Sequence, residues 1–174
     1  MQLKNSTNRI LQEFFDFPRK EFHMREISRR VKLAQPSVIL HLKALLQEKY
    51  IIKEKKGIYP TFRANREFEK FKLLKKMNIV LRIQESGLLS YLYDSCLPEA
   101  IILFGSAAWG EDIEESDLDI FLACSSQNLQ LEKYEKILNR KINVFFEKDI
   151  SRLSAELKNN ILNGVILKGY LKVF

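Results

Sequence analysis

The sequence predicts an α+β protein made of two modules, and two observations carry that prediction. Charge divides the chain: residues 1–85 hold 20 Lys and Arg against 9 Asp and Glu, whereas residues 86–174 hold 9 against 13. The hydrophobic pattern also changes, from helical spacing followed by a hairpin to apolar strands joined by polar turns. A basic module, net +11, joined to an acidic one, net −4, indicates two modules with different partners.

Composition narrows the class of protein. With 46% hydrophobic and 29% charged residues, six Gly and four Pro, the chain is neither disordered nor of low complexity. No apolar run approaches the ~20 residues of a spanning helix, and the first residues lack the core of a secretory signal. Cys96 and Cys124 lie in apolar stretches and are expected to be buried thiols; with His23 and His41 they give no zinc spacing. We therefore expect a soluble cytoplasmic protein with no membrane partner.

Three helices are expected in residues 1–64. The first begins at Ser6 or Thr7 and ends before Pro18, because proline pushes its predecessor out of the helical region. The second covers residues 24–31. A turn at residues 34–37 precedes the third helix, with Pro36 suited to its first position. The apolar stripe of this third helix consists of Val38, Leu42, Leu45 and Leu46.

A strand pair follows, over residues 50–54 and 58–63, joined through Lys55, Lys56 and Gly57. The order of helix, helix, turn, helix and basic-tipped hairpin resembles the winged helix-turn-helix family of transcription regulators. The resemblance implies DNA as a partner, with the third helix in the major groove and the hairpin against the neighbouring backbone or minor groove. The residues that it implies as DNA contacts are Gln35, Ser37, His41, Lys55 and Lys56.

Ile39 and Leu40 depart from that family pattern, because members usually carry polar or basic side chains there. Both lie off the apolar stripe, so a monomer would expose them. Such residues cannot hydrogen-bond base edges, although one could contact a thymine methyl group. They could equally pack against a second copy in a homodimer, against another protein or against the other domain. His41 fits a packed histidine as well as a DNA reader.

The next segment, residues 65–86, is predicted to be a connector. Residues 67–84 lack Gly and Pro and repeat apolar residues every three or four positions, which indicates a helix. This helix could serve dimerisation or domain coupling, or pack in the ordinary way. Ser86 and Gly87 then break it. The predicted domains are thus a DNA-binding domain at 1–64, the connector at 65–86 and a second domain at 87–174.

The second domain carries the most specific chemical pattern. An apolar strand at residues 99–104 leads directly into Gly105 and Ser106. Ten residues after Ser106, a second strand begins at Ser116 and carries Asp117 and Asp119 at its start. Alternate residues share a strand face, so the two carboxylates, ~7 Å apart at their Cα atoms, can share a divalent cation. That cation would offset their mutual repulsion. Gly105 permits close backbone approach, and Ser106 can donate its hydroxyl and N–H to a phosphate.

This strand, Gly-Ser and Asp-x-Asp arrangement resembles the nucleotidyltransferase superfamily that includes DNA polymerase β, and most closely its small minimal members. The matching residues are 104–110 and 116–120, and the resemblance extends weakly to residues 157–170, which fit a closing helix. It implies a mixed sheet flanked by helices and a nucleoside triphosphate ligand held by Gly105 and Ser106. It also implies Mg2+ held by Asp117 and Asp119 as the catalytic pair. Minimal members often pair with a toxin-like helical protein, which they can modify.

Asn143 departs from the superfamily pattern, which places a third carboxylate at this position of a later strand. An amide oxygen can ligate a cation but carries no charge and is no general base. Glu147 shares the strand face yet lies ~13 Å along it. Asp149 is expected to cap a helix. Trp109 stands where relatives often carry a basic residue, and it could cover the pocket or stack on a base.

Two functions of different classes therefore remain open. One is an enzyme that transfers a nucleoside monophosphate from a magnesium–nucleoside triphosphate to a hydroxyl acceptor. The other is a DNA-binding transcription regulator whose transferase-like domain is catalytically degenerate and senses nucleotide or scaffolds a dimer. Asp117 and Asp119 favour the first, whereas Asn143 and the basic module favour the second.

Overall fold

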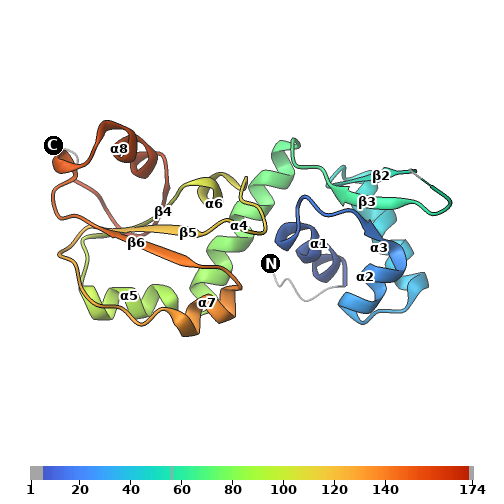
Figure 1. The fold of residues 1–174 in the computed structure, drawn as a ribbon, viewed down its shortest axis with the longest axis horizontal. Coiled ribbons are helices and arrows are strands. Elements are labelled where there is room, and N and C mark those ends of the chain that lie inside the picture. Colours follow the sequence, from blue (N-terminus) through green and yellow to red (C-terminus); the bar gives the residue numbers. More distant parts are fainter. Residues whose placement is uncertain (1–5, 56, 173–174) are drawn as a thin grey trace. The chain divides into compact units, whose positions relative to one another are not determined.

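A computed structural model describes residues 6–55 and 57–172, and the chain divides into two compact units between Lys72 and Leu73 (Figure 1). The division falls inside helix α4 (Glu69–Glu85), so the predicted connector contributes residues to both units. Each unit has its own sheet and is described by itself.

The first unit contains the three predicted helices. Helix α1 (Ser6–Asp16) ends just before Phe17 and Pro18, α2 (Met24–Val31) has the predicted bounds, and α3 (Gln35–Gln47) carries Pro36 in its first turn. The predicted apolar faces are buried except at Leu46, which is half-buried, and this confirms the helical spacing. The buried helical residues are Ile10, Leu11, Phe14, Phe15, Ile27, Val31, Val38, Leu42 and Leu45.

Three short strands complete the first unit, in the order β1-β3-β2. The predicted hairpin is confirmed as the antiparallel pair β2 (Ile51–Glu54) and β3 (Thr61–Ala64). Strand β3 begins later than expected, because Pro60 has no N–H to donate to the ladder. Strand β1 (Phe22–His23) was not predicted, since two residues carry no periodicity. Lys56, a predicted DNA contact, lies outside the described residues.

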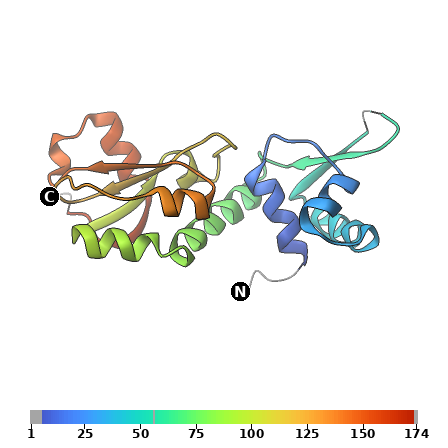
Figure 2. The ribbon, with the colours of Figure 1, turned by 60° about the horizontal axis from the view of Figure 1, so that its bottom comes forward.

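The second unit is built on a four-stranded mixed sheet, which confirms the predicted α+β class. Its strands are β4 (Ala100–Phe104), β5 (Leu118–Leu122), β6 (Ile142–Phe146) and β7 (Val165–Gly169), in the order β6-β5-β4-β7. Strands β5 and β6 are parallel, and the other pairs are antiparallel. Helices α5 (Leu88–Cys96) and α7 (Glu132–Leu138) lie on one side of the sheet and α8 (Ala155–Leu162) on the other (Figure 2).

Side chains of β4 and β5 alternate between two apolar layers. Ile101 and Ile120 face the layer that contains α5 and α7, whereas Ile102 and Phe121 face the layer that contains α8. Asp119 and Phe121 lie two residues apart in β5, so their side chains point to the same face of the sheet. The strand period thus directs the Asp119 carboxylate to the α8 side of the sheet.

The closing helix expected over residues 157–170 was wrong in its second half. Helix α8 ends at Leu162, and residues 165–169 form strand β7 against β4. The break falls at Gly164, where an added Cβ would lie 2.6 Å from the Leu103 carbonyl oxygen. Only a residue without a side chain lets the backbone approach β4 so closely.

Two smaller predictions are confirmed. Cys96 and Cys124 are free and buried, and burial raises the pKa of Cys124 to about 11. Asp149 caps the 3-10 turn η1 (Ile150–Arg152), and its hydrogen bond from Ser151 holds the pKa of the Asp149 carboxyl below its usual value. Within the described part of the chain, no helix has the length and apolar character needed to cross a bilayer.

A buried ion cluster, which the sequence did not reveal, joins α4 to the loop after α6 (Ser106–Trp109). The Lys75 ammonium lies 3.0 Å from Asp112 Oδ1, with both side chains almost fully buried. Lys75 also donates a hydrogen bond to the Asp112 carbonyl, and the Arg140 guanidinium lies 3.8 Å from Asp112 Oδ2. The carboxylate can stay ionised in the interior because the two neighbouring cations offset the free-energy cost of burying its charge.

Replacing Asp112 with Asn should destabilise the second unit by about 3 kcal/mol, because Lys75 and Arg140 would remain buried without their counter-charge. Urea unfolding followed by the fluorescence of Trp109, the single tryptophan, reports on this unit. Asp94→Asn, an exposed carboxylate on α5, is the matched control and should change stability little. Equal stability of the Asp112 and Asp94 variants would contradict the role given to the cluster.

Candidate functional site

The candidate site forms where the end of β4 lies beside the start of β5. In the antiparallel register Phe104 pairs with Asp119, the second residue of β5. Gly105 and Ser106, which follow β4, therefore come next to the start of β5 and to Asp117, which precedes it. Two segments more than ten residues apart are thereby brought together. The register thus brings the Gly105–Ser106 turn beside Asp119.

Strand β6 adds Asn143 from the other side. In the parallel register Asp119 pairs with Asn143. The Asn143 amide nitrogen Nδ2 lies 3.1 Å from Asp117 Oδ2 and 3.1 Å from Asp119 Oδ1, and it donates a hydrogen bond to each carboxylate. Asp117 and Asn143 are exposed, and Asp119 is half-buried. One amide NH2 group therefore bridges two carboxylates that would otherwise repel each other.

Gly105 is required by its conformation and by its neighbour. Its φ is +69°, and an added Cβ would lie 2.6 Å from Asp119 Oδ2. The Asp119 carboxylate thus packs directly over the Gly105 backbone. Ser106, the first residue of α6, is exposed, so its hydroxyl is open to a ligand. Because α6 has only four residues, its terminus adds little to anion binding beyond the local N–H groups.

The donor set at this edge suits magnesium. Mg2+ usually takes one or two protein carboxylates, keeps several waters and accepts substrate phosphates as further ligands. Asp117 and Asp119 supply the two carboxylates. The Asn143 amide would have to turn over to offer its oxygen, which an amide can do because its two ends have nearly the same shape. Among the described residues, no cluster of three His, Cys, Asp or Glu side chains forms a metal site.

The loop that leads into Asp117 is held by its own hydrogen bonds. The Ile113 N–H donates to Ser116 Oγ, 2.9 Å away, and the Ser116 N–H donates to the Ile113 carbonyl. Beside Asp117 opens a polar cavity of about 510 Å³. Its walls come from this loop, from α7 and from the residues before β6. They include Glu115, Ser116, Asp117, Glu132, Lys136 and Lys141.

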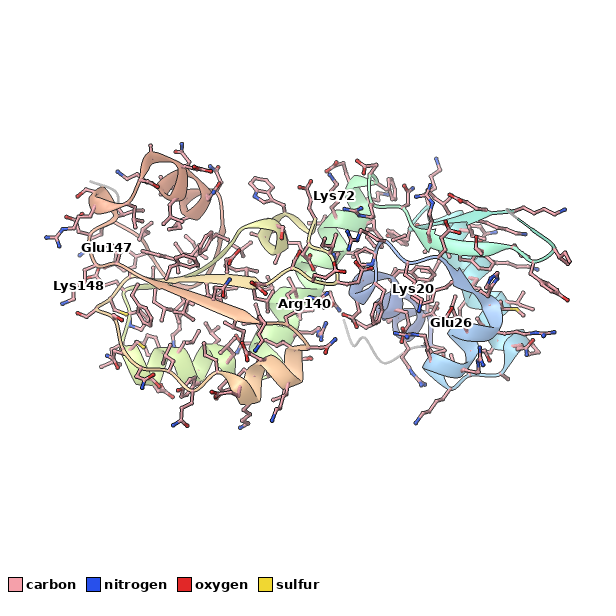
Figure 3. The ribbon with its side chains drawn as sticks, in the orientation of Figure 1. Lys20, Glu26, Lys72, Arg140, Glu147 and Lys148 are labelled. Carbon is pink, nitrogen blue, oxygen red and sulfur yellow. The ribbon has the colours of Figure 1, made fainter. Side chains whose placement is uncertain are left out.

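Other residues weighed from the sequence lie apart from the carboxylates. Glu147 follows the carboxyl end of β6 (Figure 3), whereas Asn143 is the second residue of that strand. The Glu147 carboxylate accepts a hydrogen bond from the Asp149 N–H, so it caps a turn there. Trp109 is 53% exposed, and the Lys76 ammonium lies 6.0 Å from its ring centre. Glu147 supplies no third carboxylate to the site.

The predicted DNA contacts lie in the first unit. Gln35 is exposed at the start of α3, Ser37 is half-buried, and Lys55 is exposed beyond β2. His41 Nδ1 lies 2.8 Å from Thr7 Oγ1, a hydrogen bond that links α3 to α1. As expected, Ile39 and Leu40 are exposed, at 41% and 66%. All of these residues belong to the first unit.

Comparison with known proteins finds a family match within the second unit. Residues 88–171 match the family model described as Polymerase beta, Nucleotidyltransferase. No curated protein and no solved structure matches the chain. The matched span contains β4, β5 and β6. It also contains the residues that we call the carboxylate edge: Gly105, Ser106, Asp117, Asp119 and Asn143.

Gly105→Ala should destabilise the second unit by about 2 kcal/mol, through backbone strain and the clash with Asp119. A double-mutant cycle separates the two causes: in an Asp119→Ala background the same change should cost less, because Oδ2 is gone. Gly87→Ala tests strain alone, since φ is +80° there and nothing lies near the added Cβ. Urea unfolding monitored at Trp109 measures all four variants. An unchanged cost of Gly105→Ala in the Asp119→Ala background would contradict the contact.

Proposed function

We propose that the nucleotidyltransferase-family domain of residues 88–171 binds a magnesium–nucleoside triphosphate, and that Asn143 keeps transfer of its nucleoside monophosphate slow. The observation that carries this proposal is the convergence of Asp117 and Asp119 beside Gly105 and Ser106. A purely structural sheet edge gains nothing from two adjacent carboxylates, because they repel each other.

Each residue at the edge has a part in nucleotide binding. Gly105 lets a phosphate approach the backbone, and Ser106 donates its hydroxyl and N–H to that phosphate. Asp117 and Asp119 hold Mg2+, which neutralises charge on the triphosphate when it is bound. In the free protein the Asn143 NH2 group bridges the same two carboxylates, so binding requires this amide to turn or withdraw.

Transfer needs a proton acceptor that this edge lacks. A hydroxyl that attacks the α-phosphate must lose its proton, and the Asn143 amide cannot take it. Glu147 is engaged at the other end of β6. The polar cavity beside Asp117, about 510 Å³, offers room for a hydroxyl-bearing acceptor. Positioning and metal charge alone would then support slow turnover.

Calorimetric titration of Mg-ATP and Mg-GTP tests the proposal. The wild type should bind at least one of them, and Asp117→Asn should weaken that binding by about tenfold or more, because one metal ligand loses its charge. Asp94→Asn, which removes an exposed carboxylate elsewhere in the unit, should bind as the wild type does. Asn143→Asp should tighten Mg2+ binding and raise pyrophosphate release, which reports transfer whatever the acceptor.

Absence of binding by both the wild type and Asn143→Asp would overturn the proposal. Equal binding by the wild type and Asp117→Asn would place the nucleotide elsewhere. If Asn143→Asp binds nucleotide but releases pyrophosphate no faster than the wild type, nucleotide binding would stand. The claim that Asn143 keeps transfer slow would be rejected.

A second function, DNA binding by the first unit as a transcription regulator, is supported by the arrangement of α2, α3 and the hairpin. Helices α2 and α3 follow each other across a short turn, and the exposed Lys55 borders the hairpin tip. This order resembles a winged helix-turn-helix, in which such elements meet the groove and the backbone. In this function the second unit would sense nucleotide rather than transfer it.

If the first unit binds DNA, Lys55→Ala should weaken binding to all sequences alike and lower the slope of log K against log salt by about 1. Fluorescence anisotropy with a labelled duplex at several salt concentrations measures both. Lys148→Ala removes an exposed lysine of the second unit (Figure 3) and should leave the slope unchanged. The same slope for all three proteins would reject a phosphate contact by Lys55.

A further inference from the structure

The first unit contains a cavity of about 570 Å³ that lies outside the proposed nucleotide site, and Gln35, a predicted DNA contact, is among the residues that line it. It lies between α2, α3 and the β2–β3 hairpin, and we call it the α2–α3 groove. Its volume falls in the range of sites for small organic ligands. The apolar residues that line it include Ile39, Leu42, Leu46, Tyr59 and Phe62.

The floor of the α2–α3 groove is apolar. Leu42 and Phe62 form its buried part, at 2% and 7% exposure. Ile39 and Tyr59 stand at its open side, 41% and 65% exposed. Side chains of this kind stay in contact with water only at a cost in free energy, and a ligand that covers them removes that cost.

The rim carries cations that lack partners among the described residues. Arg29, Lys43 and Lys53 line the groove, and the structure records no ion pair or hydrogen bond for these three side chains with any described residue. The one acidic lining residue, Glu26, has its carboxylate 2.6 Å from the Lys20 ammonium (Figure 3). The Arg25 guanidinium lies 5.9 Å from the Tyr59 ring centre. The groove thus combines an apolar floor with an excess of positive charge.

We infer that the α2–α3 groove binds a small amphiphilic organic acid. Its apolar body would cover Ile39, Leu42 and Phe62, and its anionic head would meet the rim at Arg29, Lys43 or Lys53. Charge complementarity selects an anion, and the concave apolar floor selects a body that excludes water. Duplex DNA would satisfy the cations but would bring polar, hydrated groups over the floor, so the observations favour the small acid.

Titration of decanoate into the isotopically labelled full chain tests this inference, with methyl NMR as the readout and the acid kept below its micelle-forming concentration. Shifts should saturate and should be largest at the methyl groups of Ile39, Leu42 and Leu46. Decanol, which has the same body without the charge, should bind more weakly. 1-Naphthoate distinguishes an aromatic from an aliphatic body, and saturable binding of either acid at these methyl groups supports the inference.

Three variants separate the rim from the floor. Lys43→Gln should weaken decanoate by about threefold to fivefold and leave decanol unchanged, as expected for the loss of one exposed charge contact. Lys70→Gln removes an exposed lysine of the same unit outside the groove and should change neither. Ile39→Gln, at a partly exposed position where folding tolerates a polar residue, should weaken both ligands.

Three outcomes would overturn the inference. Equal binding of decanol and decanoate would show that the anionic head of the ligand does not contribute to binding. Shifts spread over both units would mark non-specific contact with a detergent-like molecule. Saturable shifts of the groove methyl groups with a short DNA duplex, but with neither acid, would make this face a nucleic-acid surface.

Discussion

The site depends on one constraint, the placing of two like charges at the same edge of a sheet. Asp119 is the second residue of β5 and Asp117 lies directly before the strand. Their two-residue spacing brings both carboxylates within reach of the Asn143 amide. In the structure the Asn143 amide offsets their repulsion, with its nitrogen 3.1 Å from each. An amide dipole compensates less charge than a divalent cation would, so part of the repulsion between the two carboxylates remains.

The rest of the second unit keeps that edge in place. The parallel register of β5 and β6 sets Asn143 opposite Asp119, and the absence of a side chain at Gly105 leaves room for the Asp119 carboxylate. Asp112, buried between Lys75 and Arg140, fixes the loop that leads to Asp117. A buried charge has few alternative positions, because leaving its partners costs several kcal/mol. The carboxylates are thus positioned by contacts that do not themselves reach a ligand.

In the first unit, helix α3 offers two different surfaces. One side carries the buried apolar stripe that packs on α1 and α2. The other presents Ile39 and Lys43 to the α2–α3 groove, where apolar and basic groups lie together. Because Gln35 also lines this groove, a ligand there and DNA on α3 would compete for the same residues.

The sequence by itself determined most of the local structure and the identity of the carboxylate edge. The signals that predicted this local structure act over a few residues, so they can be interpreted without knowing the fold. They are the helical spacing of apolar residues, Pro18, Pro36 and the Asp-x-Asp pattern. Strand β7, the two-residue β1, the Lys75–Asp112–Arg140 cluster and the Asn143 bridge were decided only by the tertiary structure. Each of these features depends on which distant segments pair and in what register. The free energy of such long-range pairing leaves no pattern in the local periodicity of the sequence.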